Sequence, residues 1–165
     1  MAKGFIFDLG PCDVYFNSTL LGKTFGAVTF KYTPESRDVK EDQQGVTPVE
    51  AIIVGMVGDV TVPLTRMQLA AMATITPGAT LVTAAQMDVY NPVGINRYDN
   101  AAELKLVPYD QGVASAKWIK FPKAHPSVDL SLAFDVDTQR VYNTIFKYFP
   151  SQATPIGQLW SMGQT

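Results

Sequence analysis

The stretch IIVGMVGDVTVPLTRMQLAAMATITPG, residues 52–78, decides the fold because it holds the clearest helix signal in the chain. Two apolar, β-branched runs, residues 51–54 and 57–62, come first and predict two strands separated only by Gly and Met. Thr65 followed by Gln68 fits a capping box, in which each side chain satisfies a backbone N–H at the helix start. We therefore expect a helix that begins directly after Thr65.

The predicted helix is short and amphipathic. Its apolar face follows helical spacing through Leu69, Met72, Ala73 and Thr76. It ends at Pro77-Gly78, because proline cannot continue a helix and glycine tolerates a positive φ. A single short helix cannot form a core alone, so this one is expected to pack on a sheet as a brace.

Almost all of the remaining chain is strand-like. Residues 13–16 and 24–33 predict a β-hairpin joined by a turn at Asn17-Ser18-Thr19, and residues 5–9 form a further short apolar run. Later strands are predicted at residues 103–107, 118–121, 128–136, 141–149 and 157–162. Residues 79–87 fit a strand or a weak helix, and residues 91–101 are turn-rich. The chain is therefore expected to be a single, mainly β domain, residues 1–165.

Residues 34–48, PESRDVKEDQQGVTP, are polar, rich in charge and bounded by prolines. Connections in compact domains are usually about 4–6 residues long, so this segment predicts an unusually long loop. Long loops are most often functional or disordered. We therefore expect this loop to take part in function.

Composition favours an assembling protein over a free-standing one. Hydrophobic residues make up 47% of the chain, and charged residues only 17%, against about 25% in typical domains. Such a shortage of charge indicates surface buried between subunits. The formal net charge is −2, which gives no general attraction to nucleic acid or anionic membranes.

Cysteine content and hydrophobic runs narrow the setting of the protein. Cys12 is the only cysteine, so a disulfide within the chain and a cysteine-based zinc site within one chain are excluded. The N-terminal residues do not resemble a secretory signal, and no apolar run reaches about 18 residues. The expected location is therefore the cell interior, or a particle that assembles there.

Several short motifs suggest chemistry and fail on inspection. Gly22-Lys23-Thr24 matches the end of a phosphate-binding P-loop but lacks the earlier glycine, and a strand rather than a helix follows. His125, the only histidine, is predicted to lie in a solvated loop. Asp135 and Asp137 fit a polar turn better than a calcium loop, which needs glycine where Arg140 stands.

Basic and aromatic residues interleave in one more segment, as they do in some nucleic-acid-binding surfaces. The residues are Lys117, Trp118, Lys120, Phe121 and Lys123. Three lysines in an acidic chain fit a strand with one solvated face better. No pair of nucleophile and base, no paired carboxylates and no glycine-rich cofactor turn remains. We therefore expect no enzymatic activity, no cofactor and no metal.

Four segments together resemble the tail tube protein of long-tailed bacteriophages. They are GPCDVYF at residues 10–16, DQQGVTPV at residues 42–49, VPL at residues 62–64 and TIFKYFP at residues 144–150. A closing LWSMG at residues 159–163 adds to them, and the resemblance spans nearly the whole chain. The order and spacing of these segments carry the resemblance.

The resemblance implies a fold and an assembly. It implies two packed, roughly orthogonal antiparallel sheets, sandwich-like or barrel-like, with one flanking helix and a long loop. It implies hexameric rings that stack into the hollow tube of a phage tail, through which DNA passes without specific binding. The implied partners are further copies of the chain and the tape-measure, terminator and baseplate proteins of the virion.

Two sets of residues follow as assembly hypotheses. The long loop would contact the next ring through its charges, Glu35, Arg37, Asp38, Lys40, Glu41 and Asp42. The helix would offer a neighbouring subunit its outer face, Arg66, Met67 and Ala71. Two alternatives stay open: a ring or adaptor protein of the tail neck or baseplate with the same fold, and a soluble β-sandwich binding module, for example for carbohydrate.

Overall fold

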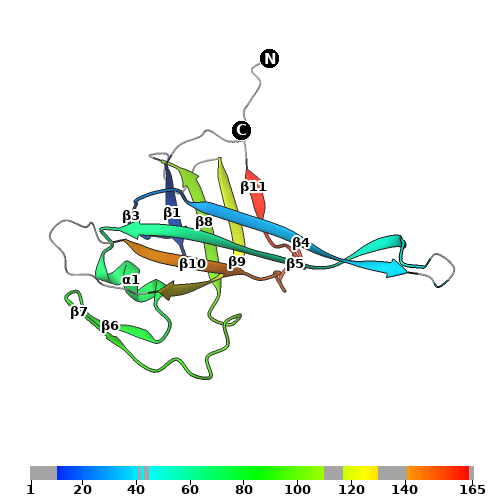
Figure 1. The fold of residues 1–165 in the computed structure, drawn as a ribbon. Coiled ribbons are helices and arrows are strands. Elements are labelled where there is room, and N and C mark those ends of the chain that lie inside the picture. The colour runs from blue at the N-terminus through cyan, green and yellow to red at the C-terminus, as the bar shows by residue number, and fades with distance from the viewer. Residues whose placement is uncertain (1–10, 41, 43–44, 110–116, 130–140, 164–165) are drawn as a thin grey trace, which may run out of the picture.

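The computed structural model describes residues 11–40, 42, 45–109, 117–129 and 141–163, and these residues are mostly strand, with one helix (Figure 1). The elements in chain order are β1 (Cys12–Phe16), β2 (Thr19–Leu20), β3 (Lys23–Thr24), β4 (Thr29–Lys40), β5 (Pro48–Thr65), α1 (Leu69–Ile75), β6 (Ala79–Thr83), β7 (Gln86–Val89), β8 (Ala102–Pro108), β9 (Trp118–Asp129), β10 (Tyr142–Tyr148) and β11 (Ser161–Gly163). None of the helical segments in this part of the chain is long and apolar enough to cross a membrane.

The larger sheet has nine antiparallel strands and folds across itself at β9. Its main path runs β2-β1-β8-β9-β10-β5-β3, while β11 joins β9 and β4 joins β5. The first part of β9 pairs with β8 and β11, and the part from Ala124 onward pairs with β10. Figure 1 shows β1, β8 and β11 crossing the directions of β10 and β5. The expected pair of crossed antiparallel layers is confirmed, as an open sheet whose two halves are continuous through β9.

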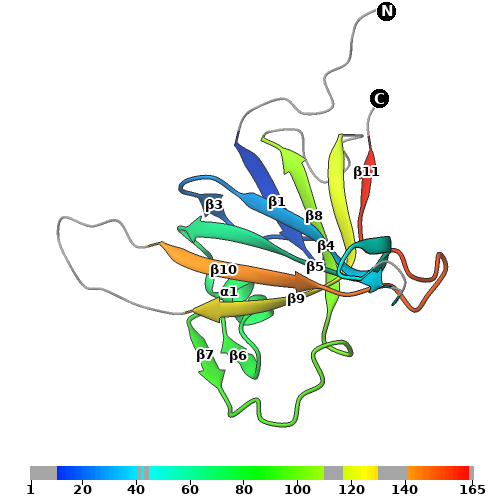
Figure 2. The same cartoon turned by 45° about the vertical axis from the view of Figure 1, so that its right-hand side comes forward.

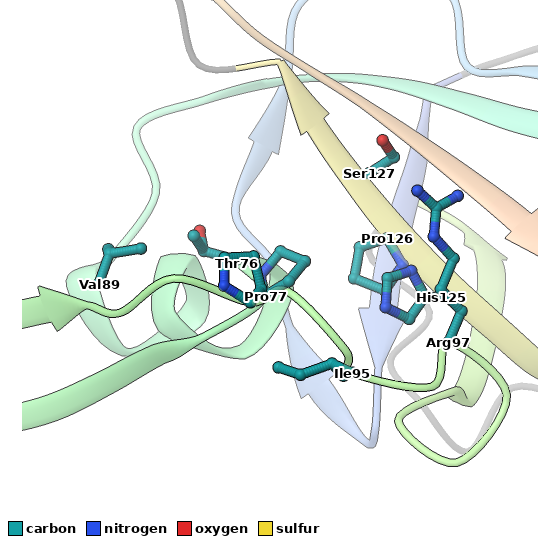
Figure 3. Close-up of a pocket in the computed structure, with 9 residues that line it drawn as sticks. Thr76, Pro77, Val89, Ile95, Arg97, His125, Pro126 and Ser127 are labelled. Carbon is teal, nitrogen blue, oxygen red and sulfur yellow. The ribbon is translucent and has the colours of Figure 1, made fainter.

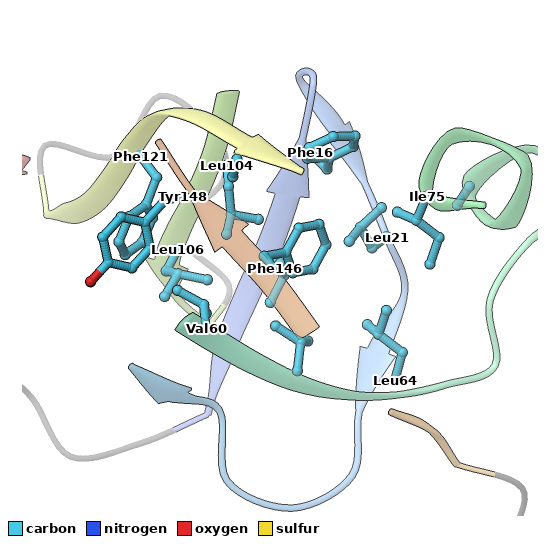
Figure 4. Close-up of a cluster of buried hydrophobic side chains, with 14 residues drawn as sticks. Phe16, Leu21, Val60, Leu64, Ile75, Leu104, Leu106, Phe121, Phe146 and Tyr148 are labelled. Atoms are coloured by element: carbon cyan, nitrogen blue, oxygen red, sulfur yellow. The ribbon is translucent and has the colours of Figure 1, made fainter. Parts of the chain in front are cut away.

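The core lies between these two halves and beneath α1. Alternating residues of β5 and β10 point into it, including Val60, Val62 and Phe146, so the period of a strand places one face of each inside. Figure 4 shows Phe146 among the other buried side chains and Ile75 of α1 facing Leu21. The helix therefore covers one end of the core, which confirms its predicted role as a brace.

Several predicted elements are confirmed. The strand at residues 103–107 is β8, and the strand at residues 141–149 is β10. The turn after β1 is a two-residue hairpin turn in which Asn17 and Ser18 both have positive φ, at 49° and 63°. Residues 79–87 form a β-hairpin of β6 and β7 rather than a helix. The predicted runs at residues 5–9 and beyond Asp129, with Asp135 and Asp137, lie outside the described residues.

The prediction of two strands and a capped helix in residues 52–78 needs correction. β5 is one strand of 18 residues that runs through Gly55 and Met56. Its last residues pair with β10 and with β3, so Thr65 is held in the sheet and does not cap the helix. The chain leaves the sheet at Arg66, whose φ is 50°, and Gln68 is the N-cap, with no side-chain capping bond. Pairing on both edges of β5 therefore delays the helix start.

The predicted hairpin of residues 13–16 and 24–33 is also wrong. β1 pairs with β2 and β8, whereas β4 pairs with β5. Likewise, the strand predicted at residues 118–121 continues as β9 to Asp129. Pro122 falls in the segment where β9 changes partners, which is where a missing backbone N–H is tolerated. His125 consequently lies in a strand, 6% exposed, and not in a solvated loop.

Both faces predicted for the helix need correction. The buried residues of α1 are Ala71 and Ile75, whereas the residues predicted to face the core are only partly buried: Leu69, Met72, Ala73 and Thr76. Ala71 is 3% exposed and belongs to the core cluster, while Ala70 is exposed. We expect Ala71→Asp to lower the free energy of unfolding by about 3–5 kcal/mol, since it buries an unpaired carboxylate. Ala70→Asp adds the same group one residue earlier, in water, and should change it by less than about 0.5 kcal/mol. Urea unfolding followed by circular dichroism measures both, and equal losses would contradict this placement of α1.

Candidate assembly surfaces

The most prominent feature of the surface is a long hairpin of β4 and β5. The two strands pair from Thr29 opposite Thr61 out to Lys40 opposite Pro48. Figure 1 shows that their outer parts extend well beyond the rest of the sheet. We call the outer part, residues 34–40 of β4 and 48–57 of β5, the projecting hairpin. Only the residues of β5 from Asp59 onward also pair with β10, so the projecting hairpin is a two-stranded ribbon.

The prediction of a loop over residues 34–48 is therefore mostly wrong. Residues 34–40 belong to β4, and the connection between the strands is confined to residues 41–47. The physical reason is the apolar run that follows: residues 48–57 form a strand, and the polar segment supplies the partner for its backbone. A strand with polar side chains on both faces has no alternating pattern to reveal it.

The apolar side chains of the projecting hairpin lie open to solvent. Ile53 is 60% exposed, and the other large apolar residues of the same segment of β5 are also exposed: Val49, Ile52, Val54, Met56 and Val57. The register shifts at Val54, because Ser36 pairs with Ile53 and Glu35 with Gly55. Three consecutive exposed apolar residues on a strand place apolar surface on both faces of the ribbon. A contiguous exposed patch of this kind marks an interaction surface.

The predicted charged residues lie on the other strand of the same ribbon. Glu35, Arg37, Asp38 and Lys40 are exposed along β4, and Asp42 is exposed just beyond it. Glu41 lies outside the described residues. The structure thus brings the predicted charges together on one strand, beside an apolar strand that the sequence analysis assigned only to the fold.

The base of the hairpin is held by a buried tyrosine that passes beneath a glycine. Tyr148 of β10 donates a hydrogen bond from its hydroxyl to the backbone carbonyl of Lys31, at 2.9 Å. A β-carbon at Gly58 would collide with this hydroxyl and with the same carbonyl. Burial, followed by the neighbouring Tyr32 and Asp59, raises the pKa of Tyr148, so the hydroxyl stays protonated and able to donate.

Aromatic rings reinforce this base. Phe30 of β4 has ring-centroid distances of 5.2 Å to Phe121, 6.1 Å to Tyr148 and 5.5 Å to Trp160. Edge-to-face aromatic pairs each contribute about 0.5–1.5 kcal/mol beyond their buried area. The projecting hairpin is therefore anchored at the point where it leaves the nine-stranded sheet, and this anchoring fixes the direction in which its apolar strand extends.

A second apolar surface lies on β6, β7 and the loop that follows. Its exposed large apolar residues are Leu81, Val82, Val89, Tyr90, Val93 and Ile95. Figures 1 and 2 place β6 and β7 next to α1, away from the end of the projecting hairpin. The two apolar surfaces are therefore separate and differ in their residues.

The remaining predicted helix residues are divided between surface and core. Arg66 is exposed at the junction of β5 and α1, while Met67 is partly buried against the core cluster. With Ala71 buried, these three residues do not form one open face. The helix contributes less free surface than the sequence pattern indicates.

The lysines interleaved with aromatic residues are largely engaged within the chain. Lys120 forms an ion pair with Glu103 at 2.7 Å. Lys123 donates to the carbonyl of Ala101 at 3.1 Å, and its amine lies 5.2 Å from the ring centroid of Tyr98. Among the described residues, no group of three or more His, Cys, Asp or Glu side chains could hold a metal.

The single thiol, Cys12, is partly buried and has the character of an unreactive group. Burial and, secondarily, the charge of Asp13 raise the pKa of Cys12 to about 11, from an ordinary value of 9.0. At pH 8 its thiolate fraction is therefore about a hundredfold below that of an unshifted thiol. We expect iodoacetamide to alkylate Cys12 about a hundredfold more slowly than a cysteine placed at exposed Gln152 in a Cys12→Ser chain. Comparable alkylation rates, measured by mass spectrometry, would overturn this assignment.

Comparisons with known proteins add no identification: no protein-family model matches the chain, and no curated protein sequence matches it.

The sequence analysis missed the two apolar surfaces because patterns of secondary structure do not show which apolar side chains a fold leaves exposed. One signal could have found the first of them. Residues 34–40 and 48–57 flank a short segment that contains Gly45, which has a positive φ of 65°. A polar run and an apolar run on either side of a glycine-containing turn are typical of a hairpin.

Proposed function

We propose that this protein is a structural subunit that assembles into hexameric rings, which stack into the hollow tail tube of a long-tailed phage. The observation that supports self-assembly is the projecting hairpin, a two-stranded ribbon anchored at its base whose large apolar side chains are exposed to water. The resemblance in sequence supplies the hexamer, the tube and the virion. A scaffold role also fits a chain in which the residue patterns for catalysis are missing, so we propose no enzymatic activity and no cofactor.

Two distinct apolar surfaces favour head-to-tail association. A two-fold dimer uses one self-complementary patch, whereas two different patches fit a contact in which one surface of a subunit meets the other surface of the next. Such heterologous contacts generate closed rings or continuing filaments. The projecting hairpin and the β6–β7 surface are the two patches that we assign to these contacts.

Backbone hydrogen bonding supports the same reading. In the outer part of β5, residues 48–57, one edge pairs with β4 and no described strand pairs with the other. Natural proteins usually cover or charge a long, apolar edge, because it pairs readily with another chain. In the proposed assembly, a neighbouring subunit extends the sheet along this edge, and the charged β4 strand meets the next ring.

The lumen and the other partners complete the proposal. An acidic chain lines a tube that repels phosphates, which lets DNA pass without specific binding. Tape-measure, terminator and baseplate proteins are the heterologous partners, and the virion tail, assembled in the host cytoplasm, is the location.

Sedimentation velocity of the purified chain separates this proposal from its alternatives. The proposed tube predicts polydisperse, fast-sedimenting polymers. A single species of ring size favours the neck or baseplate adaptor, and a monomer at all concentrations favours a soluble binding module.

A further inference from the structure

A pocket lies between the end of α1, the loop after β7, and β9. Its volume is about 360 Å³, at the lower end of the roughly 300–1,000 Å³ typical of sites for small ligands. Its apolar wall includes Pro77, Val89, Ile95 and Pro126, and its polar side chains include Arg97 and His125. Figure 3 shows Arg97 and His125 side by side along β9.

The described lining of the pocket carries positive charge, supplied by the exposed side chain of Arg97. None of the described residues that line it is acidic. In the described part of the chain, no carboxylate forms an ion pair with Arg97. His125 is almost fully buried, and burial and Arg97 lower its pKa, although its hydrogen bond to the Pro126 backbone opposes this. Among the described residues, the exposed Arg97 guanidinium therefore has no carboxylate that neutralises its charge.

We propose that this pocket binds a carboxylate attached to a small aliphatic body. The planar guanidinium of Arg97 matches a carboxylate with two parallel hydrogen bonds. The apolar wall suits a branched hydrocarbon group, and the hydroxyls of Thr76 and Ser127 line the same pocket. A dianionic phosphate fits less well, because one guanidinium and a neutral imidazole leave part of its charge unpaired beside an apolar wall.

Such a carboxylate has two sources, which share this chemistry. One is a free small acid. The other is a glutamate flanked by apolar residues in a protein segment, of which Val49-Glu50-Ala51 on the projecting hairpin of another copy is an example. Only the second source connects the pocket with assembly. The proposal that the pocket binds a carboxylate is therefore tested independently of the proposed tube.

Equilibrium dialysis of labelled isovalerate against the full chain tests the proposal, whether or not the chain is assembled. We expect saturable binding of one isovalerate per chain and at least tenfold weaker binding of the neutral isostere isovaleramide. Arg97→Gln should weaken isovalerate binding at least tenfold, and Arg97→Lys less, because lysine keeps the charge and loses the fork. Arg37→Gln, a matched change at an exposed arginine of the projecting hairpin, should have no effect.

The acid and amide comparison needs no variant, so a folding defect in Arg97→Gln leaves the test intact. Equal binding of acid and amide, or isovalerate binding that Arg97→Gln leaves unchanged, would overturn the proposal. It would also be overturned if neither isovalerate nor the peptide described next bound saturably. Competition by the peptide acetyl-PVEAI-amide, residues 48–52, then separates the sources. If the peptide displaces labelled isovalerate at lower concentrations than unlabelled isovalerate does, the ligand is a protein segment. If the peptide needs higher concentrations, the ligand is a small acid.

Discussion

A chain carrying Ile53→Lys and Val57→Lys is expected to remain folded and to lose assembly completely. Both side chains are exposed on the projecting hairpin, so lysine in these positions costs the isolated subunit little. In an interface, each lysine buries an unpaired ammonium, which costs about 3–5 kcal/mol for each copy. Six or more such contacts in a ring multiply this cost, so we expect no residual polymer.

Sedimentation and far-ultraviolet circular dichroism measure the two halves of this expectation. The matched control exchanges the two residue types, as Ile53→Val and Val57→Ile, which keeps the apolar character and the summed volume. The control should assemble like the wild type. Assembly of the lysine variant at wild-type concentrations would show that the projecting hairpin does not carry the contacts.

Gly58→Val is expected to destabilise the subunit by about 3 kcal/mol, the sum of overpacking and a lost hydrogen bond. Strand propensity alone favours valine by up to about 1 kcal/mol. The collision of its β-carbon with Tyr148 and with the Lys31 carbonyl outweighs this gain, because a carbonyl in the β4–β5 ladder cannot move without breaking that ladder. A loss of this size is a large fraction of the stability of an ordinary domain.

Unfolding by urea measures this effect, in the Ile53→Lys and Val57→Lys background so that assembly adds nothing to the stability. Gly55→Ala is the control, since its β-carbon would meet only Glu35 at an ordinary 3.9 Å. Tyr148→Phe should cost about 1 kcal/mol, which isolates the hydrogen bond. A Gly58→Val chain as stable as Gly55→Ala would refute the crossing of Tyr148 beneath β5.

Local patterns in the sequence predicted the strands that lie on the core. They failed where pairing with distant strands determines where an element begins or ends. Alternation located β8 and β10, because one face of each is buried. The capping signal at Thr65 failed because β3 and β10 hold the end of β5 in the sheet. No local rule contains that pairing, since Lys23 and Tyr142 are far from Thr65 in the sequence.

The sequence predicted only one of the two strands of the projecting hairpin as a functional element. The charges from Glu35 to Lys40 were identified as functional from their density and then placed in a loop instead of a strand. The apolar residues beside them were assigned only to strands of the fold, because the pattern of an apolar strand is the same whether or not its own chain covers it. Ala71 shows the converse error: a small residue taken for a contact surface is core. The pattern of residues in one sequence does not show which apolar side chains stay exposed in the folded chain.

Negative-stain electron microscopy of the purified wild-type chain tests the central claim most directly. The proposal predicts hollow tubes of stacked rings with six-fold symmetry in end views, and their absence from the Ile53→Lys and Val57→Lys chain prepared in parallel. Fields of separate single subunits from the wild-type chain, at concentrations where sedimentation also finds only monomer, would contradict it.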